Sequence, residues 1–313
     1  MTIFGPDVSQ YQAGLKVSTL VQQGFEFLTA RCVIGNRVDT EYARFRDESQ
    51  AAGMRFAAYV FPWTGTPVAV SADLVRRNIG DPTIPVMIDF EKDGSSVPQQ
   101  PLAAAMWDAL KAEGLNPRML YEPRWYWSQI GSHSLTGRPW KLISSSYGSN
   151  SVGHASSVYP GDSALGWAPY GGLTPTLFQF GSRIIVDGYS HKTADGTWTR
   201  LVDANAYKGT TDQLDSSGMF TDWSDMPTAV EIADETLTRD GKIPSPTIDH
   251  PPVPGNTADF YSLASWCAWI TGQVKDLQKD NAALLAAIKS ITPGGTGTFN
   301  VDGTLQLTTP PTP

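Results

Sequence analysis

Three short segments of the sequence carry carboxylic acids at positions where they could perform chemistry. Asp7 lies in GPDVSQYQ, Asp89 and Glu91 lie in IPVMIDFEKDG, and Asp203 lies in LVDANAY. Because side chains alternate along a strand, Asp89 and Glu91 point the same way, with Cα atoms roughly 6.5–7 Å apart. A protonated carboxylic acid beside an ionised one is what cleavage of a glycosidic bond requires. The pair therefore predicts glycoside hydrolysis.

Other chemistries find less support in the sequence. Taken singly, Asp7 or Asp203 could cap a helix or pair with a lysine, but burying two charges in Asp-Phe-Glu costs several kcal/mol unless they are paired or used. The acids could also hold Mg²⁺ or Ca²⁺, which take oxygen ligands, although we expect no metal and no cofactor. No zinc spacing, Gly-x-Ser-x-Gly elbow or phosphate-binding glycine loop is present, and the four histidines are scattered: His133, His154, His191 and His250.

Aromatic side chains follow the predicted strands at the same ends as the acids. Sugar rings stack on such faces through C–H contacts and apolar area. We expect a glycan-binding surface made of Tyr59, Phe61, Trp63, Tyr121, Trp125 and Tyr147.

The scaffold for these residues is predicted to be an α/β fold. Up to about residue 208, short apolar and β-branched runs alternate with helical or turn-rich segments. Helical spacing ending in glycine is found at 17–24, 42–53, 69–80 and 102–114. Eight strands predict an irregular (β/α)8-type barrel, whose chemistry lies at the carboxyl ends of its strands. These strands are 2–9, 25–33, 54–61, 84–91, 118–122, 140–146, 175–180 and 199–207.

The later part of the chain is predicted to be divided into further segments. Residues 147–175 are poor in helical pattern, and 181–200 reads as a β-hairpin with an Asp-Gly turn. We assign residues 1–210 to the barrel, 211–257 to a Pro-rich linker, 258–292 to a coiled-coil helix, and 293–313 to a tail with a strand pair and a Pro/Thr end.

The coiled-coil prediction rests on a 3,4 spacing sustained over more than four heptads. The spacing runs through Phe260, Leu263, Cys267, Ile270, Val274, Leu277, Asn281, Leu284, Ile288 and Ile291. Ile270 to Ile288 would form the oligomer's core. The alternative, an amphipathic helix packed on its own barrel, stays open. An Asn at an a position such as 281 suits two strands, but three strands stay open, so we expect a trimer or a dimer.

Charge and composition narrow the choice of partners. Residues 1–208 contain 18 Lys+Arg and 18 Asp+Glu, whereas residues 209–313 contain 5 and 13. Neither part supplies the basic surface that nucleic acid needs, and no apolar run is long enough for a membrane span. The first residues do not resemble a secretory signal. Cys32 and Cys267 lie far apart, so we expect no disulfide.

The ordered set of motifs resembles glycoside hydrolase family 25, the Chalaropsis-type muramidases of bacteria and their phages. The matching pieces are PDVSQYQ, FLTARCVIG, AAYVF, IDFE, LYEPRWYW, LFQF and VDANAYKGT, covering roughly residues 3–210. The resemblance implies hydrolysis of the β-1,4 bond from N-acetylmuramic acid to N-acetylglucosamine. It implies Glu91 as general acid/base, Asp89 as the carboxylate that supports the oxocarbenium ion or the acetamido group, and Asp7 and Asp203 as the remaining acids. Substrate contacts are implied at Tyr59, Tyr121 and Gln179.

The C-terminal segments favour one setting for this enzyme. A coiled coil and a β-structured tip, in place of a wall-binding repeat module, indicate an enzyme mounted on a phage tail tip, with other tail proteins as further partners. Two alternatives remain: a catalytically inactive glycan-binding structural or adsorption protein, or a free monomeric endolysin released from the host cell. In each case the expected partner is bacterial peptidoglycan.

Overall fold

The computed structural model describes residues 2–92, 94, 96–221 and 223. Beyond them it describes four short strands, at 243–244, 260–261, 296–299 and 305–308. The chain divides into two compact units, Met1–Met226 and Pro227–Pro313, which are considered separately.

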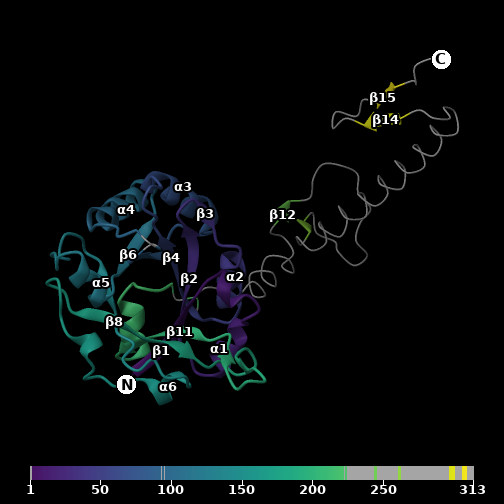
Figure 1. Cartoon of the computed structure of the whole chain (residues 1–313). Coiled ribbons are helices and arrows are strands. Elements are labelled where there is room, and N and C mark those ends of the chain that lie inside the picture. The colour runs from purple at the N-terminus through teal and green to yellow at the C-terminus, as the bar shows by residue number, and fades with distance from the viewer. Residues whose placement is uncertain are drawn as a thin grey trace. The chain divides into compact units, whose positions relative to one another are not determined.

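The first unit is built on a closed barrel of eight strands surrounded by helices (Figure 1). Pairing of β1 with both β11 and β2 closes the sheet, and a short strand, β3 (Arg37–Val38), extends it beside β2. The eight predicted strands are all present. The barrel strands are β1 (Thr2–Val8), β2 (Phe27–Ile34), β4 (Arg55–Phe61), β5 (Pro85–Asp89), β6 (Asn116–Tyr121), β7 (Lys141–Ser145), β8 (Pro175–Ile184) and β11 (Val202–Lys208).

One strand runs against the others. The neighbouring pairs from β1 through β2, β4, β5, β6 and β7 to β8 are all parallel, whereas β11 is antiparallel to both β1 and β8. A (β/α)8 barrel has only parallel strands, so the predicted irregularity is confirmed and lies mainly in this last strand.

Helices cover the first half of the barrel; the first four lie where their apolar spacing predicts, whereas the fifth is not predicted. They are α1 (Val17–Gln22), α2 (Tyr42–Ala51), α3 (Val68–Asn78), α4 (Pro101–Ala112) and α5 (Arg124–Gln129). Helix α4 begins with a proline, which suits a first helical position, and buries Ala103, Met106, Trp107 and Leu110 along one face. Between β7 and β8 the chain forms only α6 (Ala155–Val158) and the 3-10 turn η2 (Leu165–Trp167).

The predicted hairpin within 181–200 is shorter than expected. Residues up to Ile184 continue β8, and the hairpin consists of β9 (His191–Lys192) and β10 (Trp198–Thr199). Its turn contains Asp195, whose carboxylate accepts a hydrogen bond from the Thr197 N–H.

The inside of the barrel is packed below the mouth by its own apolar cluster. Phe27, Met87, Met119, Ile143 and Leu177 belong to it and are all at most 7% exposed. A larger cluster lies between the outer face of the strands and the helices. The interior is thus filled below the level at which the acidic side chains lie.

The amino ends of the strands are closed by residues that the sequence assigns to the linker. Helix α7 (Thr211–Ser216) follows β11 and begins with a capping box at Thr210. After it, Met219 and Phe220 are buried in the interior cluster, and Thr221 pairs with Phe56 near the start of β4. The boundary at residue 210 is therefore wrong: the compact unit continues to Met226.

The second unit is described only at its strands. β12 (Ile243–Pro244) pairs with β13 (Phe260–Tyr261), so residues 260–261 are extended where the sequence predicts helix. β14 (Thr296–Phe299) pairs with β15 (Leu305–Thr308), where a strand pair is predicted. The other coiled-coil positions, including Ile270, Val274, Leu277, Asn281, Leu284 and Ile288, lie outside the described residues. Across the described part of the chain, no helix has the length and apolar character of a membrane span.

Candidate active site

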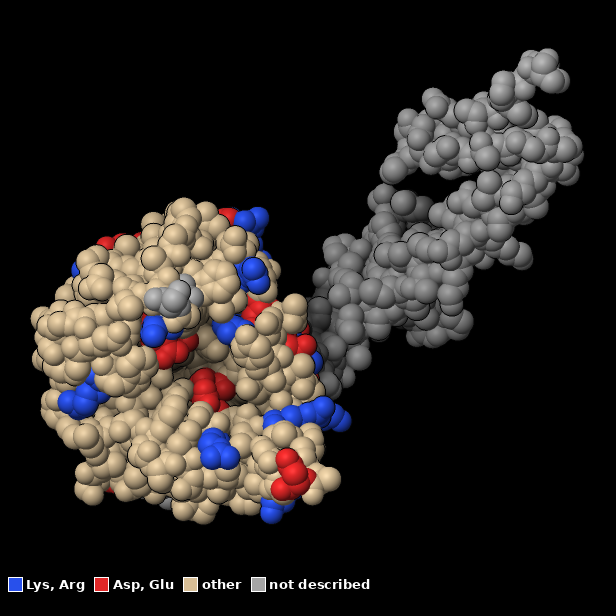
Figure 2. Space-filling view, in the orientation of Figure 1, with Lys and Arg blue, Asp and Glu red and all other residues tan. Residues whose placement is uncertain are grey.

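A cavity of about 340 Å³ opens at the carboxyl ends of the parallel strands. Figure 2 shows it as a hollow in the barrel unit with red acidic side chains inside. Asp7, Asp89, Glu91 and Asp203 all line it, together with aromatic and amide side chains. Four acids from three distant segments of the sequence thus face one space large enough for part of a sugar chain.

The reversed strand explains how Asp203 reaches this cavity. Asp203 is the second residue of β11. A barrel of parallel strands, as the sequence predicts, would instead require it to lie near the carboxyl end of its strand. Because β11 is antiparallel to β1, its beginning lies beside the end of β1, and Asp203 is directly opposite Asp7 in the register. The prediction that Asp203 faces the mouth is correct, but the strand direction behind it is wrong.

The Asp89–Glu91 pair has the expected alternation. Asp89 is the last residue of β5 and lies opposite Tyr121 of β6. Phe90 between the two acids is 1% exposed and packs outward with Tyr126 of α5, at 5.6 Å between ring centroids. Anchored by this outward phenyl ring, the backbone holds both carboxyl groups toward the cavity.

Gln179 of β8 connects both sides of the site through its amide group. Its Oε1 accepts hydrogen bonds from the Tyr121 hydroxyl at 2.8 Å and the Tyr147 hydroxyl at 2.5 Å. Its Nε2 then donates to Oδ2 of Asp7 at 2.7 Å, and Asn205 Nδ2 donates to the same oxygen at 2.8 Å. Because the two hydroxyls need an acceptor, they fix the amide orientation that supplies a donor to Asp7.

The environments of the four acids favour their protonated forms. Burial and the nearby Asp7 raise the pKa of Glu91 to about 7. Burial, Glu91 and Asp7 raise the pKa of Asp89, with Arg31 opposing them, and burial, Asp7 and Glu91 raise that of Asp203. Burial also raises the pKa of Asp7, against the hydrogen bonds from Gln179 and Asn205. Crowded carboxyl groups of this kind share protons near neutral pH.

A buried ion pair forms one wall of the cavity. Arg31 of β2 is 7% exposed, and its Nε donates to Oδ2 of Asp39 at 2.8 Å. Asp39 is 2% exposed and also accepts from the backbone N–H groups of Gln10 and Glu41, both at 3.0 Å. Above the guanidinium lies the Tyr11 ring, 5.3 Å from Cζ to the ring centroid. Arg31 and Tyr11 both line the cavity.

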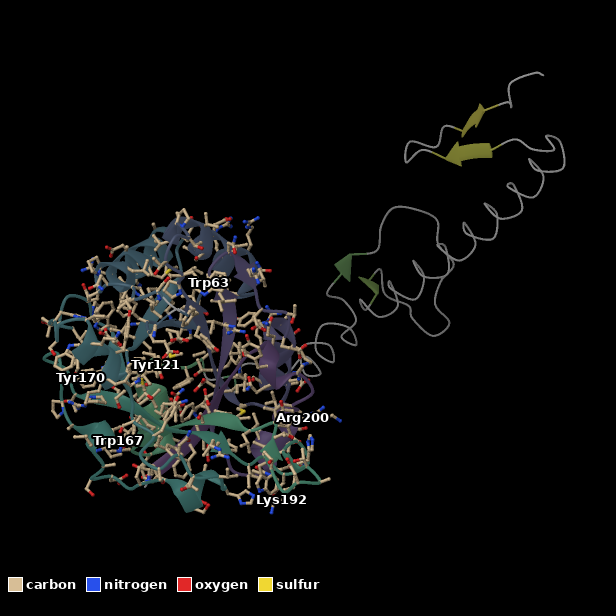
Figure 3. The ribbon with its side chains drawn as sticks, viewed as in Figure 1. Trp63, Tyr121, Trp167, Tyr170, Lys192 and Arg200 are labelled. Carbon is tan, nitrogen blue, oxygen red and sulfur yellow. The ribbon has the colours of Figure 1, made fainter. Side chains whose placement is uncertain are left out.

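Most of the aromatic residues predicted to contact the glycan line the cavity. Tyr59, Phe61, Tyr121 and Tyr147 line the cavity, as does Gln179. Trp63 does not: its indole ring packs over Gly35, where an added Cβ would come within 2.5 Å of it. In Figure 3 Trp63 lies apart from Tyr121, toward the edge of the unit. This side chain is removed from the site because it covers the loop after β2.

Trp125 and the described histidines, His133, His154 and His191, do not line the cavity. Trp125 is 52% exposed at the start of α5 and is not among the residues that line the cavity. Among the described residues, no group of three or more His, Cys, Asp or Glu side chains is arranged to hold a metal ion. His133 lies instead beside the buried Glu122, with Nε2 and Oε1 3.2 Å apart.

Sequence reasoning missed Arg31 and Asn205. Asn205 is two residues after Asp203, so the alternation used for Asp89 and Glu91 would have found it. Arg31 is a single charge within the apolar run FLTARCVI of β2, where all but the last residue are buried. A lone cation in a buried strand is a signal of a polar partner or ligand.

Comparisons with known proteins agree with this fold. The model of the family described as glycosyl hydrolases family 25 matches residues 6–184. The fold is similar to a muramidase from Trichobolus zukalii (20% identity, TM-score 0.52, 69% of this chain and 99% of that chain). It is also similar to a bacterial lysozyme from Streptomyces coelicolor (19% identity, TM-score 0.53, 69% of this chain and 97% of that chain). A third similar structure is the catalytic domain of an endolysin from a bacteriophage of Listeria monocytogenes (18% identity, TM-score 0.52, 70% of this chain and 98% of that chain). No curated protein sequence matches the chain.

Proposed function

The chain belongs to the glycosyl hydrolases of family 25, and from that premise we propose that it cleaves the β-1,4 bond between N-acetylmuramic acid and N-acetylglucosamine in bacterial peptidoglycan. Family membership indicates a muramidase that hydrolyses peptidoglycan. The bond, the residues that act on it and the setting are the proposal.

The observation that carries the proposal is the position of Glu91 beside Asp89 in one cavity, where burial raises the pKa of Glu91. With a pKa of about 7, Glu91 is a carboxylic acid at slightly acid pH and can donate a proton to the glycosidic oxygen. The bond between the anomeric carbon and that oxygen then breaks, and its electron pair stays on the oxygen. The Glu91 carboxylate next accepts a proton from water, whose oxygen ends on the anomeric carbon.

Asp89 is the partner in this scheme and acts in its ionised form, which the positive charge of Arg31 favours against the effect of burial. Its Oδ1 is buried and has no hydrogen-bond partner among the described residues. An acceptor left without a donor is costly unless a ligand uses it. In the proposed reaction it faces the developing positive charge or the acetamido N–H of the sugar, while Asp7 and Asp203 complete the acidic floor.

Digestion of purified peptidoglycan tests both the bond and the acid. The new reducing ends are reduced with borohydride and identified by mass spectrometry. We expect reduced muramic acid with the wild type and a loss of at least about 100-fold in Glu91→Gln, as removal of a general acid predicts. Glu113→Gln, at the end of α4 and outside the cavity, is the matched control. Absence of new ends on several walls would favour an inactive glycan-binding protein.

We further propose that the enzyme acts from a phage tail as an oligomer. The heptad spacing from Leu263 to Ile291 supports association, and one similar fold is a bacteriophage endolysin catalytic domain. Light scattering of the full chain gives its mass, with Leu277→Asp/Leu284→Asp as the variant that breaks the apolar stripe. A trimer or dimer that becomes a monomer in the variant is expected. A monomeric wild type whose C-terminal part binds cell walls would indicate a free endolysin.

A further inference from the structure

We propose that Arg31 binds the carbonyl oxygen of a substituent on the bound glycan and thereby selects sugars that carry this substituent. This inference rests on the proposed function, because it names a substrate group recognised in the same cavity. The group is the acetamido carbonyl of a sugar or the carbonyl of the lactyl substituent on muramic acid.

The first support is an unused donor. Arg31 is 7% exposed, yet its Nη2 is buried without a hydrogen-bond partner among the described residues. The bond from Nε to Asp39 holds the guanidinium plane at one edge and leaves Nη2 free. A buried charged donor that makes no hydrogen bond is costly. This nitrogen is therefore suited to donate to an oxygen that arrives with a ligand.

The second support is the location of this donor. Of the described residues that line the cavity, Arg31 is the one cation, among four carboxyl groups. Its pairing with Asp39 satisfies Nε only, and Asp39 is also held by two backbone N–H groups. Arg31 thus lines the cavity with a donor that its structural partner Asp39 does not use.

The third support is the matching orphan acceptor on the same cavity. Asp89 Oδ1 lacks a donor, just as Arg31 Nη2 lacks an acceptor. A secondary amide carries both partners, a carbonyl oxygen and an N–H. The Tyr11 ring beside the guanidinium is 75% exposed, which offers an apolar face on which the adjoining sugar can stack.

Binding to an inactive enzyme provides the first test. In the Glu91→Gln background, the Kd of three ligands is measured with and without Arg31→Met: chitotetraose, its fully de-N-acetylated form, and a tetrasaccharide that contains N-acetylmuramic acid. For an acetamido contact we expect Arg31→Met to weaken chitotetraose about 10- to 100-fold, as loss of a charged hydrogen bond predicts. The de-N-acetylated ligand carries amines, so removal of a cation from the acidic cavity should tighten its binding.

The three ligands also separate the two sources of the carbonyl. Weaker binding of the muramic acid ligand alone identifies the lactyl carbonyl, which supports the proposal in its second form. Equal weakening of all three ligands, or no change in any, overturns it, because structural damage does not distinguish an amide from an amine.

A second variant guards against misfolding, since Arg31→Met leaves Asp39 buried without its cation. Arg31→Lys keeps the charge for Asp39, but its single ammonium nitrogen cannot occupy the positions of both Nε and Nη2, so the contact proposed for Nη2 is lost. With Arg31→Lys we expect a 10- to 100-fold lower kcat/KM on peptidoglycan, carried by KM, and unfolding close to that of the wild type. Arg138→Met, which breaks a surface pair with Asp108, is the control. If the wild type does not cleave peptidoglycan the proposed function fails, whereas the binding comparison still decides the role of Arg31.

Discussion

Replacing Glu91 by glutamine should stabilise the protein at alkaline pH while it removes activity. The folded protein holds the Glu91 carboxyl at a pKa of about 7 against an ordinary value of 4.5. Between these two values the native state binds more protons than the unfolded state, so the free energy of unfolding falls as pH rises through this window. At about 1.4 kcal/mol for each pH unit, the penalty above pH 7 is about 3 kcal/mol.

Glutamine has no charge to bury, so the variant avoids this penalty. At pH 4 both side chains are neutral, and the two proteins should unfold alike. At pH 8.5 the variant should gain about 3 kcal/mol, or roughly 6–12 °C in the melting temperature of a barrel of this size. Urea and thermal unfolding at both pH values measure the gain.

The control is Glu113→Gln, which removes a partly exposed carboxylate that pairs with Arg76. The difference in free energy of unfolding between this control and the wild type should be the same at pH 8.5 as at pH 4. A Glu91→Gln variant that is no more stable than wild type at pH 8.5, or equally stabilised at pH 4, would refute the argument that the site buries this charge at a cost.

Three further predictions follow from the same geometry. The kcat/KM for peptidoglycan should fall about tenfold per pH unit above pH 7, because Glu91 must be protonated; a flat profile to pH 9 would exclude it as the acid. Gln179→Leu removes a donor to Asp7, so kcat/KM should fall roughly 10- to 100-fold. Because the lost hydrogen bond lowers the pKa of Asp7, the acid limb of the pH profile should shift to higher pH; an unshifted limb would contradict this. Phe220→Ala should cost about 3–5 kcal/mol of stability, measured by urea unfolding, with kcat of the folded protein preserved; a loss of kcat would mean that the closed end of the barrel affects catalysis.

The barrel could be predicted because its strands and helices have strong local patterns. The buried runs of β2 and β5 and the 3,4 spacing of α4 depend on nearest neighbours in the chain. The direction of β11 could not be predicted, since no local pattern distinguishes a parallel from an antiparallel strand that is buried on both faces. That is why Asp203 was assigned to the correct mouth with the wrong strand direction.

Two other differences have physical reasons that lie in tertiary packing. Trp63 has the same type and strand-end position as Phe61, yet it turns away to cover Gly35. The segment after residue 210 is rich in polar residues, but Met219 and Phe220 are buried at the end of the barrel. Neither outcome can be read from composition, because each depends on which surface the folded barrel leaves open.

The hydrogen bonds of the site show the same limit. The alternation in LVDANAY places Asn205 on the same face as Asp203, but nothing in the sequence links Gln179 to Asp7, 172 residues earlier. Arg31 stands out as a charge in an apolar strand, while its unused Nη2 is evident only in the folded structure, in which Asp39 binds Nε.

The reversed direction of β11 also decides where new protein could be attached. Thr2 pairs with Lys208, and Thr221 pairs with Phe56 at the beginning of β4, so the first and last described residues of the barrel unit leave it at the end opposite the cavity. A reporter, a binding domain or a surface tether could be fused at either terminus of this unit without its junction crossing the path of a glycan strand. Because both of these ends lie on the same side of the barrel, the unit is also suited to circular permutation. The new termini would be placed in the exposed hairpin turn at 193–197.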